Sequence, residues 1–173
     1  MSEPHRTRTV TWQDPRRVVE AAPHMSGIEL LRAMGNGEFP PPPMALLVGL
    51  TPVLAEEGRV VFAMTPAEFH YNTMDVVHGG AIATLVDTAL GCAVMSKMPA
   101  GTSYTTVELH LNFVRPVTAA TGRVSCEALV LHSGKRMATA EAKVRDDAGK
   151  LYAHATTTCF VFPIPSVSTS TAT

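Results

Sequence analysis

Four segments in the second half of the chain alternate between apolar and polar residues, the two-residue period of half-buried strands. They are 106–113, 124–131, 138–145 and 151–162. The apolar positions are Val107, Leu109, Leu111 and Phe113 in the first, Val124, Cys126, Ala128 and Val130 in the second, and Ala138, Ala140, Ala142 and Val144 in the third. Short turns separate the segments, which favours antiparallel neighbours. The pattern predicts a sheet of long antiparallel strands.

One segment, 79–97, is small or apolar around almost its whole circumference and predicts a helix that is buried on most sides. Asp87 is its only charged residue before Lys97. The predicted elements match in length, because a strand of about 11 residues reaches about 36 Å and a helix of about 18 residues about 27 Å. The sequence therefore predicts an α+β fold in which a long, curved antiparallel sheet wraps around one central helix.

Polar segments flank this core. Residues 1–25 predict a flexible arm in which 15–22 can form a short helix. Residues 163–173, rich in Ser, Thr and Pro, predict a disordered tail. We therefore expect one domain, residues 26–162.

The first part of that domain predicts one helix and two strands. Residues 26–34 predict a helix that is capped by Ser26 and ended by Gly35. Residues 46–54 and 58–64 predict two strands joined by a turn.

Composition excludes several classes of function. The net charge of −1 gives no basic field that would indicate nucleic acid or an acidic membrane as a partner. The three cysteines lie far apart in apolar segments, as small buried residues of a reducing compartment do, and the N-terminus lacks the apolar run of a signal peptide. The seven histidines have no metal-ligand spacing. We expect a cytoplasmic protein with no cofactor and no nucleic-acid or membrane partner.

The start of the central helix has the chemistry of a site for a polarised oxygen. The first N–H groups of a helix have no partner inside it, and the helix dipole adds a partial positive charge there. Gly79 and Gly80 would let a substrate approach this backbone closely. An acid such as Asp87 inside an apolar helix is costly to bury unless it has a partner or a task. Together these residues suggest a polarised carbonyl and a carboxylate that acts on water.

These features occur together in a known family. The matching residues are Asn72, His78-Gly79-Gly80, Asp87, Thr105–Leu109, Phe113–Val117, Ser133–Arg136 and Gly149–Leu151. In this pattern the chain resembles the PaaI-like acyl-CoA thioesterases of the hotdog fold, over about residues 44–162. One position departs from the family pattern, since Asp75 stands where these enzymes often carry a glycine.

The resemblance implies a role for each residue of the motif. The backbone N–H of Gly79 points at the thioester oxygen, and Asn72 assists at that end of the site. Asp87 is either the general base toward water or the nucleophile on the carbonyl. The hydroxyl of Thr106, or alternatively that of Thr105, holds the water. The imidazole of His78 is a candidate general base, but the family chemistry does not use it as the base, and a ring that packs and hydrogen-bonds to shape the turn is the preferred interpretation. The implied activity is hydrolysis of acyl-CoA to a carboxylate and CoA.

Helix geometry predicts that two subunits share each site. Asp87 lies seven residues beyond Gly80, roughly 10 Å along the same helix, so one subunit cannot bring its own Gly79 amide and Asp87 onto one carbonyl. Two antiparallel central helices can. We expect a homodimer with two equivalent sites, each with Gly79 from one subunit and Asp87 from its neighbour. The resemblance further implies that dimers pair into a homotetramer.

The remaining candidates concern the two parts of the substrate. Those for the CoA part are Gly80, Arg115, Gly134, Lys135 and Arg136, because arginine and lysine bind phosphate and glycine permits close approach. Those for an apolar acyl pocket are Met74, Met95, Met98 and Tyr104. Core packing and plain solvation are the alternatives for these residues.

Alternative interpretations stay open for two residues of the motif and for the function. Asp87 can be a structural acid bonded to a turn, and Asn72 a turn residue bonded to the backbone. A non-catalytic acyl-CoA binder would need no Asp87. A hydratase or dehydratase for enoyl thioesters on the same fold would place a histidine and an acid differently around the helix.

Overall fold

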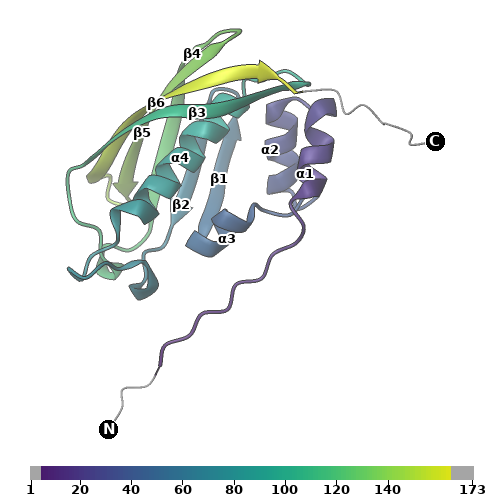
Figure 1. The fold of residues 1–173 in the computed structure, drawn as a ribbon. Coiled ribbons are helices and arrows are strands. Elements are labelled where there is room, and N and C mark those ends of the chain that lie inside the picture. The colour runs from purple at the N-terminus through teal and green to yellow at the C-terminus, as the bar shows by residue number, and fades with distance from the viewer. Residues whose placement is uncertain (1–4, 165–173) are drawn as a thin grey trace.

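The computed structural model describes residues 5–164, in which a six-stranded sheet curves around one long helix (Figure 1). The strand order is β1-β2-β4-β5-β6-β3, and all neighbours are antiparallel. The strands are β1 (Leu50–Glu56), β2 (Arg59–Met64), β3 (Thr102–Phe113), β4 (Val124–Ser133), β5 (Met137–Asp146) and β6 (Leu151–Pro163). The predicted α+β architecture is confirmed. None of the helices in the described part of the chain has the length and hydropathy to cross a membrane.

The central helix, α4 (Gly79–Met95), lies in the concave face of the sheet (Figure 1). Its sheet-facing side chains, such as Leu85 and Leu90, are fully buried. Ser96 fixes its C-terminal end, because the Ser96 hydroxyl donates to the Ala93 carbonyl at 2.6 Å and accepts the Gly58 N–H at 2.8 Å. The helix is therefore held against the sheet both along its length and at this end.

Alternation holds in the strands that cover α4 but not throughout β3. The predicted inner positions of β4 from Val124 to Ala128 and of β5 from Ala138 to Val144 are buried. In β3 a β-bulge leaves Val107 unpaired, between the pairs Thr106–Cys159 and Glu108–Thr158. The extra residue shifts the alternation by one, so Val107 is 60% exposed while Leu109 packs on the core. The prediction that these two share a face is wrong.

The N-terminal part forms three short helices, α1 (Arg16–Ala21), α2 (Gly27–Gly35) and α3 (Pro43–Val48). Turns of 3₁₀ helix occur at Ala22–His24, Glu68–His70 and Ala119–Thr121. The predicted strand over 46–54 is wrong at its start, because Pro43 begins a helix that ends at the left-handed Gly49, and β1 begins only at Leu50. The predicted disordered tail of 163–173 is wrong at its start, because β6 runs through Pro163 and the Ile164 N–H donates to the Gly101 carbonyl at 2.8 Å. The rest of that tail, from 165 onward, lies outside the described residues.

The predicted cap of α2 is present. The Glu29 carboxylate accepts hydrogen bonds from the N–H and the hydroxyl of Ser26, at 2.8 and 2.6 Å. These bonds lower the pKa of Glu29, the hydroxyl making the larger contribution. The helix runs through Gly35, one residue beyond the predicted end.

Gly27→Ala is expected to destabilise the protein by about 2–3 kcal/mol. A Cβ at Gly27 would lie 1.8 Å from the carbonyl oxygen of Met95, at the end of α4. Because this obstacle is backbone, α2 as a whole would have to move. Gly35→Ala is the matched control, since nothing lies within 4 Å of its Cβ, and it should cost nothing. Denaturant unfolding of both variants measures the difference, and equal stabilities would contradict this packing.

Candidate active site

The turn before α4 leaves one backbone donor free. His78 caps the helix, because its Nδ1 accepts the Gly80 N–H at 2.8 Å, and its carbonyl accepts the Ala81 N–H at 2.9 Å. The Gly79 N–H has no hydrogen-bond partner within residues 5–164. Of the two glycines, Gly79 therefore keeps a donor for a ligand at the positive end of the helix.

Asn72 holds the same turn. Its Oδ1 accepts the Met74 N–H at 2.8 Å, and its own N–H donates to the Val76 carbonyl at 2.8 Å. Between them, Asp75 has φ of 60°, the only positive value at a non-glycine residue in the described part of the chain. This left-handed backbone is the conformation that favours glycine, the residue that the family resemblance leads one to expect where Asp75 stands. Asn72 thus positions the turn, and its assistance at the thioester stays a prediction.

Asp87 lies on the open face of α4, next to β3. The Thr106 hydroxyl donates to its Oδ1 at 3.1 Å, and the carboxylate is exposed. This contact depends on the bulge at Val107, which places the side chains of Thr106 and Leu109 on the same side of the strand. The acid is therefore bonded to a strand hydroxyl rather than to a turn, and stays accessible from the open side of the helix.

The free Gly79 N–H and the Asp87 carboxylate are separated along α4. Eight residues of helix correspond to a rise of about 12 Å, so the two groups cannot contact one carbonyl within a chain. Within the described chain the two groups thus stay apart on one helix. A site shared between two subunits stays a prediction.

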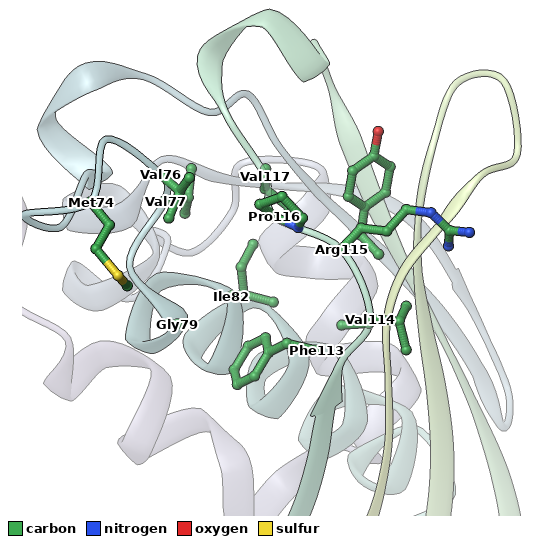
Figure 2. A pocket seen from close by; sticks show the side chains of 12 residues that line it. Met74, Val76, Val77, Gly79, Ile82, Phe113, Val114, Arg115, Pro116 and Val117 are labelled. Carbon is green, nitrogen blue, oxygen red and sulfur yellow. The ribbon is translucent and has the colours of Figure 1, made fainter.

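An apolar cavity opens beside Gly79 (Figure 2). Its volume is about 360 Å³, and Met74, Val76, Ile82, Phe113 and Val117 are among the residues that line it. The Phe113 ring covers Gly79, because a Cβ there would lie 3.1 Å from the Phe113 Cζ. The Arg115 side chain extends away from Phe113 and donates to the Leu151 carbonyl at 2.6 Å. The lining is thus hydrophobic next to the free amide.

Sequence reasoning found this cavity only in part. Met74 lines it, but Met98 is buried in the core, and Met95 and Tyr104 pack against the core. The four do not form one pocket, because Met95 is the last residue of α4 and Met98 and Tyr104 come after it in the chain. Tyr152 also lines the cavity, but no pattern in the sequence pointed to it as a pocket residue. Residues 113–117, by contrast, belong to the segments in which the sequence resembles the thioesterase family.

The residues predicted to bind CoA are divided between the two ends of α4. Arg115 and Gly80 lie at the N-terminal end. Gly134 and Lys135 line a cavity of about 390 Å³ with Lys97, at the C-terminal end, and the adjacent Arg136 is exposed. The 17 residues of α4 separate these ends by about 25 Å. One chain therefore does not bring the two groups together, and their joint role stays a prediction.

The cysteines are expected to be unreactive in the folded protein. Burial, with a smaller contribution from the charge of Asp87, raises the pKa of Cys92 to about 12. Burial and the nearby Glu127 raise the pKa of Cys126 to about 12, and burial also raises the pKa of Cys159. The reactive form is the thiolate, which is scarce at pH 8 when the pKa is this high. A thiol-reactive dye should therefore titrate three thiols per chain after unfolding, but no rapid one before it.

The comparisons place the chain in a family. Residues 74–153 match the model of the Thioesterase superfamily. A "Putative esterase" of Saccharolobus solfataricus is 32% identical over 100 residues, 58% of this chain and 69% of that protein. A "Putative esterase" of Halobacterium salinarum is 39% identical over 70 residues, 39% of this chain and 44% of that protein, so the match spans less than half of this relative.

A solved structure matches the fold. The Escherichia coli PaaI protein from the phenylacetic acid degradation operon is similar with a TM-score of 0.69, over 82% of this chain and 99% of that chain, at 24% identity. The chain belongs to the thioesterase superfamily and has the hotdog fold.

Proposed function

We propose that this protein hydrolyses acyl-CoA thioesters to a free carboxylate and CoA. The observation that carries the proposal is the Gly79 N–H, which has no partner in the described chain and lies beside an apolar cavity. Thioester hydrolysis needs such a donor for the carbonyl oxygen and a group that acts on water. Asp87, bonded to Thr106 on the open face of the same helix, is the candidate for the second task.

The proposed reaction begins when the thioester oxygen accepts the Gly79 N–H. Water then attacks the carbonyl carbon while Asp87 accepts its proton, or Asp87 attacks first and water hydrolyses the resulting anhydride. In both routes the C–S bond breaks, and the thiolate of CoA leaves and takes up a proton. The Thr106 hydroxyl holds Oδ1 of the carboxylate and orients the group that attacks.

The complete site would form between two copies of the chain. The face of α4 that carries Gly80, Thr84 and Asp87 is the open one, and β3 is an edge strand with no further strand beside it in residues 5–164. Antiparallel pairing of two α4 helices across a two-fold axis would bring Gly79 of one subunit close to Asp87 of the other. The homodimer is thus proposed as the catalytic unit, and pairing of dimers into a tetramer stays a prediction.

The acyl group would enter the cavity beside Gly79. Its hydrophobic lining and its volume of about 360 Å³ suit an aromatic or medium-length acyl group. The operon named for the PaaI protein concerns phenylacetic acid, a carboxylate of this kind. Phenylacetyl-CoA is therefore the first substrate to test.

The test is thiol release from a panel of aromatic and straight-chain acyl-CoAs. Release from at least one of them supports the proposal, and the ranking identifies the acyl group. Tight acyl-CoA binding without release would instead indicate a binding protein. A change in enoyl absorbance with crotonyl-CoA, without free thiol, would indicate a hydratase. Either of the last two outcomes overturns the proposal.

A further inference from the structure

A second cavity flanks the start of α4, on the side of Gly80. It has a volume of about 470 Å³, and its α4 wall consists of His78, Gly80, Ala81 and Thr84. The first cavity contains Gly79, and so the two cavities meet at adjacent residues of one helical turn. A thioester bound at the Gly79 N–H would have one cavity for the acyl group and the other for the thiol part.

The N-terminal arm contributes the charged group of this second cavity. The Arg8 guanidinium lies 3.9 Å from the centroid of the Phe69 ring and donates to the carbonyls of Leu46, at 3.1 Å, and Leu47. Two residues earlier, Arg6 Nε forms an ion pair with Glu68 at 2.9 Å. These contacts hold the arm against α3 and the turn of 68–70, and they place Arg8 in the wall of the cavity.

Arg8 keeps both charge and donors after these contacts. A guanidinium has five N–H groups, and the two carbonyls occupy two of them. Arg6 is neutralised by Glu68, whereas no carboxylate within residues 5–164 forms an ion pair with Arg8. His78 adds a second donor, because its Nδ1 accepts the Gly80 N–H and the ring proton is then on Nε2.

We propose that the second cavity and Arg8 bind the phosphate-bearing pantetheine part of the CoA thioester. Arginine matches the geometry of phosphate oxygens and keeps its charge at any relevant pH. Each cavity has one arginine in its lining, Arg115 in the first and Arg8 in the second. The Arg115 side chain extends away from Phe113 and donates to the Leu151 carbonyl, so the wall beside Gly79 is apolar, whereas Arg8 belongs to the cavity on the side of Gly80. This proposal rests on the proposed hydrolysis, but it concerns residues 5–14, which lie outside the family match of 74–153.

The test compares Arg8→Ala on two substrates with the same acyl group, the CoA thioester and the truncated N-acetylcysteamine thioester. Loss of a charged hydrogen bond should raise KM for the CoA thioester about tenfold, with a smaller change in kcat. The effect on kcat/KM of the truncated thioester, which has no phosphate, should be several times smaller. Arg8→Lys keeps the positive charge but lacks the forked pair of N–H donors. Its KM for the CoA thioester should lie between those of the wild type and Arg8→Ala. Arg17→Ala, at an exposed arginine of the same arm, is the control.

Inhibition by the free thiol products gives a second readout. CoA should inhibit hydrolysis of the truncated thioester less strongly in Arg8→Ala than in the wild type, whereas inhibition by pantetheine should change little. An equal loss on both thioesters, together with a lower melting temperature, would make Arg8 an anchor of the arm only and would overturn the proposal. An unchanged KM for the CoA thioester would overturn it too. If the wild type hydrolyses neither thioester, the proposed function itself fails.

Discussion

Asp87→Asn is expected to lower kcat for acyl-CoA hydrolysis by about a thousandfold, within the range of a lost general base. The amide has nearly the same shape, and its oxygen can still accept the Thr106 hydroxyl, which in the wild-type protein donates to Oδ1 of Asp87 at 3.1 Å. It can neither take a proton from water nor attack the carbonyl. Because the side chain is exposed in the described chain, the fold should persist. Thiol release measures the loss, and thermal unfolding checks the fold.

Thr106 provides the matched comparison for that experiment. Thr106→Ser keeps the hydroxyl that donates to Asp87, whereas Thr106→Val keeps the branched shape and removes the donor. A positioning role predicts a loss of about tenfold in the valine variant and little change in the serine variant. If Asp87→Asn retains activity within a few-fold of the wild type, the acid has no part in the chemistry and the proposed mechanism is wrong.

The fold could be predicted from the sequence because its two periodicities are regular. Alternation is regular in β4 from Val124 to Ala128 and in β5 from Ala138 to Val144, and α4 is apolar almost all round. Each of these patterns is therefore compatible with one type of element only. The bulge in β3 could not be predicted, because Val107 and Leu109 have the spacing of a regular strand. Only pairing with β6 shows that one residue is extra. Similarly, Pro42 and Pro43 are compatible either with an extended segment or with the start of a helix, and the structure has the helix.

The sequence indicated residues for a candidate site but not the cavity beside them. The spacing of Gly79 and Asp87 on one helix sufficed to predict that the two groups of one chain cannot contact the same carbonyl. The cavity beside Gly79, by contrast, is built from segments far apart in the sequence, such as Met74, Phe113 and Tyr152. The position of Arg8 was even less predictable, since the sequence of a polar arm does not indicate where the arm packs. Its contacts with Phe69 and α3 exist only in three dimensions.

Gly79→Pro is expected to lower kcat by about a hundredfold or more, the usual effect of removing one oxyanion donor. Proline suits the first position of a helix, and the preceding His78, with φ of −59° and ψ of 133°, has the extended backbone that a proline requires. The substitution therefore removes the N–H with little change of the backbone. Gly79→Ala is the control, because its Cβ meets the Phe113 ring as the proline ring does but the N–H stays. Equal losses in both variants would indicate that the ring contact matters rather than the donor.

The same two lesions test whether the site is shared between subunits. Gly79→Pro and Asp87→Asn each inactivate both sites of their own homodimer. If Gly79 of one subunit acts with Asp87 of the other, a mixed dimer has one site with both lesions and one with neither. Random pairing of equal amounts should then restore roughly a quarter of the wild-type activity, since half of the dimers are mixed and each has one intact site of two. If each subunit instead built its site alone, every site would carry a lesion and mixing would restore nothing.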